Sequence, residues 1–105
     1  MGQDFLEQNT KTASVLLKAL SNEKRLQIAC VLFKGEKAVG ELEKVVGLSQ
    51  SALSQHLARL RRDNIVSTRR EAQTIYYSLS DEAAIKVLEC LTEILGCSEI
   101  CSSEA

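Results

Sequence analysis

The residues of this chain best suited to contact another molecule chemically recur at helical spacing between positions 49 and 62. Four of them would share one face of a helix: Ser51, Gln55, Ala58 and Arg62. Short side chains let a helix approach a DNA major groove, Gln and Ser can hydrogen-bond base edges, and Arg can pair with guanine or phosphate. The face carries no Asp or Glu, whereas most solvated helix faces mix both signs of charge. The pattern therefore favours a helix that reads DNA.

Further side chains in and after this helix complete a predicted DNA interface. We expect base-edge contacts from short polar and imidazole side chains, namely Ser51, Ser54, Gln55 and His56. We expect phosphate or minor-groove contacts from four arginines, namely Arg59, Arg62, Arg69 and Arg70. Near the helix N-terminus, Ser49 and Gln50 are expected to contact the DNA backbone. Arg25, in contrast, is interpreted as a structural ion-pair residue.

The second group of chemically competent residues consists of four cysteines, Cys30, Cys90, Cys97 and Cys101. A cysteine inside an apolar helix is often only a small buried residue, and we interpret Cys90 in this way. Cys97 and Cys101 stand about one helical turn apart if the helix continues. Together with Cys30 they could bind a thiophilic ion such as arsenite or Cu(I). Because the single histidine, His56, lies in the candidate DNA-reading helix, we rank a metal site lower and expect no cofactor.

Helices must position these side chains. Apolar residues at helical spacing predict three helices before the DNA-reading one, over residues 10–20, 22–34 and 40–46. Asn22 would cap the second helix, Gly35 would end it, and Gly47 would close the third. Ser49 would cap the fourth helix, which carries the polar face. A short helix, a turn with Gly and a polar-faced helix together predict a helix-turn-helix.

After the fourth helix the apolar period changes from that of a helix to that of a strand. Residues 65–70 and 74–79 are rich in β-branched and aromatic side chains and predict a β-hairpin joined by residues 71–73. The expected fold class is therefore mainly α with a β-hairpin wing, a winged helix-turn-helix of four helices, two strands and a last helix. The last helix begins after Ser80 and is apolar on more than one face, which predicts a dimer.

Composition restricts the classes of function. At 105 residues the chain is expected to be one domain, with flexible tails at about 1–9 and 98–105. The aromatic content of 4% is too low for the base-stacking platforms of single-strand or RNA-binding domains. The net charge is −1, but residues 49–79 contain five arginines against Asp63 and Glu71, a local balance of +3. A basic centre between acidic ends would orient the protein on DNA.

Several other classes are not expected. The sequence has no apolar run long enough for a membrane span and no signal-peptide pattern, so we expect a cytoplasmic protein without a static disulfide framework. It has no Cys-x-x-Cys, no glycine-rich phosphate loop and no histidine beside a nucleophile, so we expect no enzyme. A protein-interaction module on the same scaffold is an alternative, although it would not need an acid-free helix face.

Four segments together resemble the ArsR/SmtB family of bacterial winged-helix repressors, at residues 17–26, 39–42, 47–63 and 69–77. The resemblance covers about residues 10–97 and is closest to the branch containing BigR, SqrR and HlyU, whose members respond to reactive sulfur or oxidants. It implies a homodimer built on the first and last helices, bound to double-stranded operator DNA with two half-sites about one helical turn apart. Three positions depart from the family: Ala38 replaces a common Ser or Thr cap, Asn64 replaces a usual Gly, and Gly96 is an extra residue.

The resemblance also implies a role for two of the thiols. In the sulfur-sensing branch a cysteine at the place of Cys30 pairs with one near the end of the last helix. Cys97 is the nearest match, and Cys101 is a possible substitute or resolving thiol. Crosslinking by a persulfide, a polysulfide or an oxidant would move the last helix and lower operator affinity. The alternative is a sensor of arsenite or another thiophilic metal through Cys30, Cys97 and Cys101.

Overall fold

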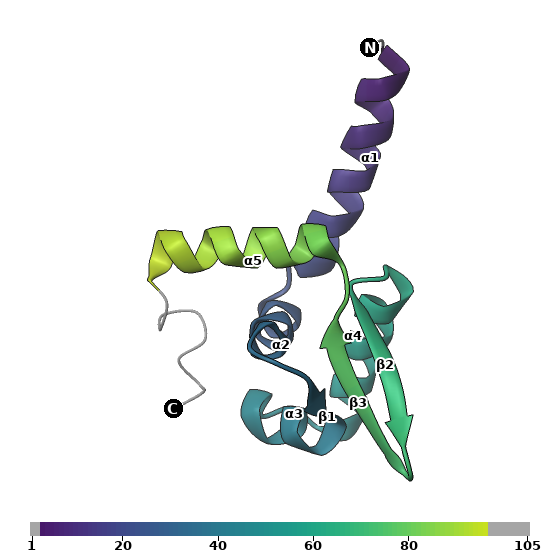
Figure 1. Ribbon diagram of the computed structural model, residues 1–105, viewed down its shortest axis with the longest axis vertical. Coiled ribbons are helices and arrows are strands. Elements are labelled where there is room, and N and C mark those ends of the chain that lie inside the picture. The colour runs from purple at the N-terminus through teal and green to yellow at the C-terminus, as the bar shows by residue number, and fades with distance from the viewer. Residues whose placement is uncertain (1–2, 97–105) are drawn as a thin grey trace.

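The computed structural model describes residues 3–96 as five helices and a small antiparallel sheet (Figure 1). In chain order the elements are α1 (Gln3–Leu20), α2 (Glu23–Phe33), β1 (Lys37–Ala38), α3 (Val39–Val46), α4 (Gln50–Arg62), β2 (Val66–Glu71), β3 (Thr74–Leu79) and α5 (Glu82–Leu95). This order confirms the predicted winged helix-turn-helix. Cys97 and Cys101 lie outside the described residues.

Local capping explains where most helices begin. Asn22 Oδ1 accepts a hydrogen bond from the Arg25 N–H at 3.0 Å, as the sequence predicts for the start of α2. At the start of α3, where Ala38 offers no capping side chain, its own N–H donates to Glu41 Oε1 at 2.8 Å. This bond is the carboxylate half of a capping box. The departure at Ala38 therefore leaves one end-group interaction in place.

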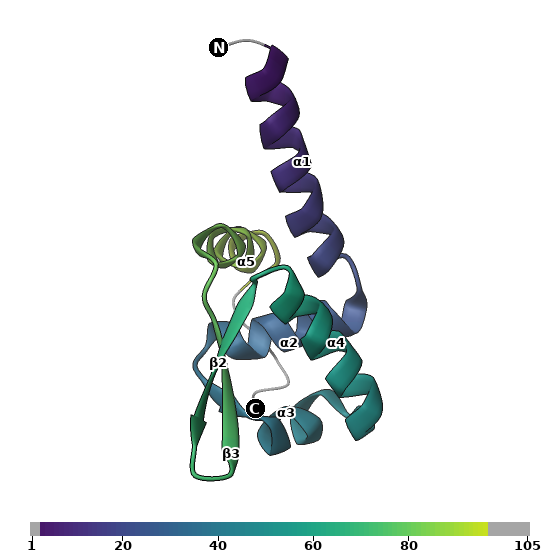
Figure 2. The same ribbon diagram turned by 90° about the vertical axis from the view of Figure 1, so that its right-hand side faces the viewer.

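The first helix is longer than the sequence predicts. α1 begins at Gln3 rather than near residue 10. The sequence does not predict this early start, because the segment from 3 to 9 has too few apolar residues to show a helical period. Figures 1 and 2 show that α1 extends away from the body formed by the other elements. Its first half consequently has no core of its own to pack against, and the side chain of Leu6 is exposed.

The wing is a three-stranded sheet rather than the expected two-stranded hairpin. Its order is β1-β3-β2, all antiparallel. In the hairpin, Val66 pairs with Leu79 and Glu71 pairs with Thr74. Strand β1, which the sequence did not predict, adds the pair of Ala38 with Tyr76. This third strand attaches the hairpin to the residues that lead into α3.

Two residues in the left-handed region shape the wing. Asn64, with φ of 61°, makes the turn from α4 into β2, and Asn is the residue after Gly that best tolerates this conformation. The hairpin tip has Ala72 at φ of 58°. The departure from Gly at position 64 is thus compatible with the fold, as expected from the tolerance of Asn for this conformation.

The core lies between α2, α4 and the start of the wing. α2 contributes Cys30 and its neighbours, and α4 buries the predicted stripe of Leu53, Leu57 and Leu60. α5 adds Ala84 and Leu88 from its first half. Within residues 3–96, none of the helices combines the length and the apolarity that crossing a membrane requires.

Candidate nucleic-acid interface and thiol site

α4 presents the predicted reading face to solvent. Its start is fixed by Ser49, whose Oγ accepts a hydrogen bond from the Ala52 N–H at 3.3 Å. With the leucine stripe buried, the opposite face is exposed at Ser51, Gln55, Ala58 and Arg62. Gln50 and Ser54 are also exposed and flank this face. The structure therefore brings together the small and polar side chains that the sequence assigned to DNA contact.

The arginines at the end of α4 share one carboxylate. Arg59 Nε lies 3.0 Å from Asp63 Oδ2, and Arg62 Nε lies 3.4 Å from Asp63 Oδ1. Burial alone would raise the pKa of Asp63, but hydrogen bonds and charges from the two arginines lower it below its ordinary value. Arg62 keeps 68% of its side chain exposed and has only the longer contact, so it is the better placed of the two to reach DNA.

His56 stands at the edge of the reading face rather than in its centre. Its side chain is half-buried, and burial, followed by the charge of Arg25, lowers the pKa of the imidazole. Arg25 itself donates from Nε to the Ala19 carbonyl at 2.6 Å and from Nη2 to the Lys18 carbonyl at 3.2 Å. The interpretation of Arg25 as an ion-pair residue is therefore corrected, because its hydrogen-bond partners are the last carbonyls of α1.

The two wing arginines differ in how they are held. Arg69 donates from Nε and Nη2 to the two oxygens of Glu36, both at 2.8 Å. Its guanidinium also lies 4.5 Å from the centre of the Tyr76 ring. Arg70 makes one contact of 3.3 Å to the Ala72 carbonyl. Sequence reasoning missed Glu36, because its partner is 33 positions away and no local pattern connects the two.

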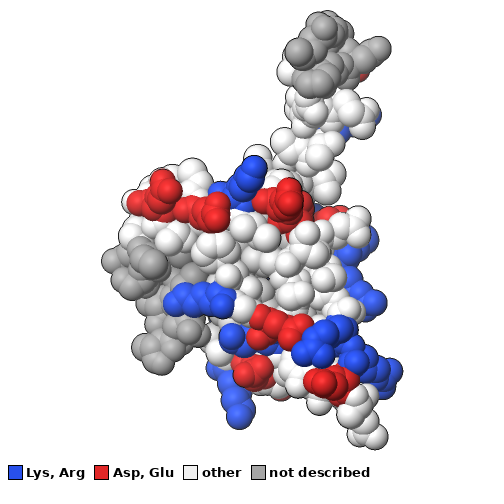
Figure 3. Space-filling model, viewed as in Figure 1, with Lys and Arg blue, Asp and Glu red and all other residues white. Residues whose placement is uncertain are grey.

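Charge is distributed unevenly over the molecule. In the view of Figure 3, basic side chains follow the right-hand edge and the lower part of the molecule, where acidic side chains lie among them, while the upper surface over α5 carries mainly acidic side chains. Four exposed arginines belong to α4 and the wing, namely Arg61, Arg62, Arg69 and Arg70, whereas α5 has Lys86 as its only basic residue. Acidic groups on α5 would keep that helix away from a phosphate backbone.

The cysteines of the described region occupy contrasting environments. Cys30 is 1% exposed in the middle of α2, which packs against α5. Cys90 is exposed on α5, so its interpretation as a small buried residue is wrong for the single chain. The other proposed sensing residue, Cys97, falls outside residues 3–96 together with Cys101. Among the described residues, no group of three or more His, Cys, Asp or Glu side chains lies close enough to hold a metal ion.

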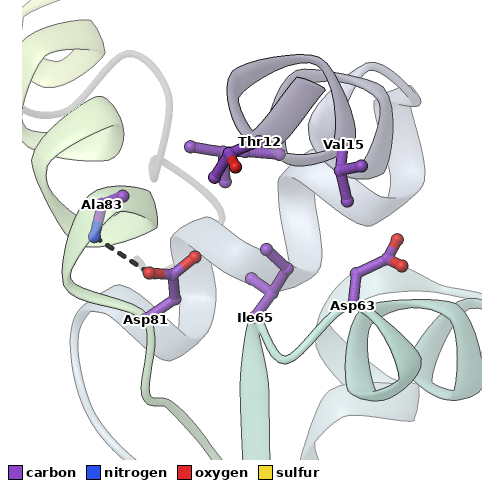
Figure 4. A pocket seen from close by; sticks show the side chains of 7 residues that line it. Thr12, Val15, Asp63, Ile65, Asp81 and Ala83 are labelled. Atoms are coloured by element: carbon purple, nitrogen blue, oxygen red, sulfur yellow. Dashed lines mark hydrogen bonds between the residues drawn. The ribbon is translucent and has the colours of Figure 1, made fainter. Parts of the chain in front are cut away.

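A cleft of about 280 Å³ lies where α1, the end of α4 and the start of α5 meet (Figure 4). Its lining residues are Thr12, Val15, Leu16, Asp63, Ile65, Asp81 and Ala83. Figure 4 shows Ile65 at its floor, between the two aspartates. The sequence did not predict this cleft, because it joins segments that are distant in the chain.

The main chain of Ile65 connects the two helices beside this cleft. Its N–H donates to the Leu60 carbonyl of α4 at 2.9 Å, and its own carbonyl accepts from the Ser80 N–H at 3.0 Å. Asp81 caps α5 by accepting from the Ala83 N–H at 3.1 Å. Two main-chain hydrogen bonds thus join the segment that leads into α5 to the end of α4.

Comparison with known proteins places these features among DNA-binding regulators. The sequence profile described as "Bacterial regulatory protein, arsR family" matches residues 22–68. The transcriptional activator HlyU of Vibrio cholerae is 56% identical over 87% of this chain and 84% of the relative. The solved structure of reduced HlyU from that organism has a TM-score of 0.84 at 53% identity, covering 87% of this chain and 96% of that one.

Two further matches extend the comparison. The biofilm growth-associated repressor of Agrobacterium fabrum is 42% identical over 90% of this chain and 80% of the relative. A homodimeric winged helix-turn-helix DNA-binding domain from Mycobacterium bovis has a TM-score of 0.76 at 26% identity. That match covers 94% of this chain and 91% of the other. The matches to HlyU and to the biofilm growth-associated repressor cover 87% to 90% of this chain, well beyond the segment that the profile matches.

Proposed function

Because the chain belongs to the ArsR family of bacterial regulatory proteins and is a transcriptional regulator, we propose that it represses transcription as an operator-bound homodimer that reactive sulfur releases. Repression is supported by its similarity to a biofilm growth-associated repressor. α4 would read the major groove of each half-site, and the wing would contact the adjacent backbone. The observation that carries this proposal is the exposed, acid-free face of α4 opposite its buried leucine stripe.

The DNA interface is tested by reversing the charge of Arg62, the last residue of the reading helix. Arg62→Glu should weaken duplex binding by about tenfold or more, because one arginine contact is worth roughly 1–3 kcal/mol. Lys86→Glu is the matched control, since it makes the same change of net charge at an exposed position of α5. Affinity is measured by fluorescence anisotropy over a series of salt concentrations. An equal loss of DNA affinity in the two variants would favour a protein-interaction module. A wild-type DNA affinity that does not change with salt concentration would favour it as well.

The proposed sensor is a dithiol of Cys30 and Cys97. One thiolate attacks a polysulfide, breaking a sulfur–sulfur bond, and a shorter polysulfide leaves. The second thiolate attacks a sulfur of the new hydropolysulfide chain, and hydrosulfide leaves, so the two side chains become joined. Because Cys30 is 1% exposed, we assign the first attack to Cys97 and the second to Cys30.

The fold offers a route from this crosslink to DNA. A bridge from Cys97 to Cys30 would pull the end of α5 toward α2, the helix against which α5 already packs. The start of α5 is hydrogen-bonded through Ile65 to the end of α4. Movement of α5 would therefore change the orientation of α4, the reading helix. A coupling free energy of about 1–3 kcal/mol between the crosslink and DNA binding would lower operator affinity several-fold to a hundredfold.

Peptide-mapped mass spectrometry tests the sensing chemistry. The reduced protein is treated with polysulfide in one sample and with peroxide in another, and Cys90→Ser serves as the matched control because Cys90 lies outside the proposed pair. We expect a crosslink of Cys30 to Cys97 that carries extra sulfur after polysulfide, and a plain disulfide or none after peroxide. Absence of that crosslink in both samples would contradict sulfur sensing and direct attention to thiophilic ions.

A further inference from the structure

Arg69, one of the two wing arginines, is bound to the body of the protein by an unusually complete set of contacts. Nε and Nη2 form a bidentate pair with Glu36, both at 2.8 Å. Nη1 lies 3.5 Å from Glu71 Oε1, and the guanidinium carbon lies over the Tyr76 ring, 4.5 Å from its centre. All three nitrogens of this group therefore have carboxylate partners within the same chain, and its central carbon has an aromatic ring beside it.

The atoms that Arg69 directs at Glu36 are the same atoms that would bind a DNA phosphate. The fork of a guanidinium binds a carboxylate and a phosphate with the same bidentate geometry. For Arg69 to bind a phosphate in that way, it must first leave Glu36. Arg70 and Arg62 have no such obstacle, since their contacts are single and longer, 3.3 Å and 3.4 Å.

Glu36 is positioned for this role by the sheet. It immediately precedes β1, whose pairing with β3 places Lys37 opposite Tyr77. Arg69 faces Tyr76 across the β2–β3 ladder. The strand pairing thus holds Glu36 and Arg69 on neighbouring parts of one small sheet, although 33 positions separate them. The pair does not depend on a flexible loop reaching across the surface.

We infer that Glu36 is a specificity-determining residue, which competes with DNA phosphate for Arg69 and so suppresses binding to DNA of arbitrary sequence. This inference rests on the proposed DNA interface. When α4 fits a correct groove, the wing is held against the backbone long enough for a phosphate to replace the carboxylate. On other DNA sequences α4 does not keep the wing against the backbone, and Arg69 remains paired with Glu36.

The test is a double-variant cycle on a short duplex of arbitrary sequence. Glu36→Gln should raise affinity several-fold and steepen the salt dependence, because one additional phosphate contact adds about 0.9 to the slope of log affinity against log salt. In an Arg69→Ala background, the same Glu36→Gln change should raise affinity by less than about twofold. Glu71→Gln is the matched control, since it removes the same charge from the wing but only the 3.5 Å contact.

Each other outcome contradicts the inference. An equal gain from Glu36→Gln with and without Arg69 would mean that only a negative charge near DNA had been removed. An unchanged or lower affinity would mean that Glu36 supports Arg69 for contact rather than competing for it. Glu36 is exposed and lies just before β1, so folding is expected to persist, and circular dichroism checks it. Failure of Arg62→Glu to lose affinity would instead count against the proposed interface of α4.

Discussion

At the scale of single residues, Asp63 connects the end of the reading helix to the cleft beside α1 and α5. Its carboxylate accepts hydrogen bonds from Arg59 and Arg62, and it lines the cleft. A negative charge at a helix C-terminus is unfavourable with the helix dipole, whereas the two arginines favour it. The pKa of Asp63 is nevertheless lowered, against the effect of its burial, so the arginines outweigh both unfavourable influences.

Asp63→Asn should lower the free energy of unfolding by about 0.5 kcal/mol at neutral pH, the order expected of a partly exposed pair. Because the pKa of Asp63 in the folded chain lies below its ordinary 3.8, the contribution is complete above that value. It is lost as the pH falls through the folded pKa. Urea denaturation of both proteins, from neutral pH down to about 3, measures the difference. A difference that stays constant into acid would show that the charge of Asp63 contributes nothing.

Residue contacts are predictable from sequence only when they are local. The reading face and the leucine stripe of α4 follow from helical spacing, because both arise within one element. The contacts of Arg25 and Arg69 do not, since the first reaches the carbonyls of Lys18 and Ala19 and the second reaches Glu36. Residue types identified these arginines as polar and charged, but only the packed fold determines which partners they meet.

At the scale of elements, periodicity predicts the helices and the hairpin but not strand β1. Two residues, Lys37 and Ala38, show no alternation, and they form a strand only because Tyr76 and Tyr77 offer a free edge of β3. Periodicity also does not predict the early start of α1, because the first turns of that helix lack an apolar face. An element such as β1, which is defined by a tertiary contact, is therefore not predicted by the local sequence pattern.

The turn between α3 and α4 supplies a paired test of helix-turn-helix geometry. Gly47, at φ of 66°, ends α3, and a Cβ there would meet nothing within 4 Å, so the backbone conformation alone is at issue. Gly47→Ala should therefore destabilise the fold by about 1–2 kcal/mol. Gly40→Ala, in open space inside α3, should instead stabilise it by about 0.5 kcal/mol. Thermal unfolding of both variants measures the contrast. Shifts of the same sign would contradict the conformational requirement at Gly47.

At the scale of the whole molecule, the shape and the exposed apolar surface point to a second subunit. The described chain extends over 48 × 32 × 21 Å, and the long axis includes α1, which stands away from the body (Figure 2). Leu6, Val15 and Leu17 are exposed on that helix, and Ile94 and Leu95 are exposed on α5. A helix without a core beneath it gains little from folding alone. A partner chain that covers these residues would supply the missing contacts.

Ile94→Lys should therefore weaken self-association without unfolding the chain. The side chain of Ile94 is 68% exposed in the single chain, and burying an isoleucine is worth about 1.5–3 kcal/mol. Its loss should raise the dissociation constant of the dimer by roughly 10- to 100-fold. Ile75→Lys is the matched control, because Ile75 is an exposed isoleucine of the wing, away from α1 and α5. Sedimentation velocity over a range of concentrations measures both variants. Dimers that persist in Ile94→Lys but dissociate in Ile75→Lys would move the subunit interface from the outer helices to the wing.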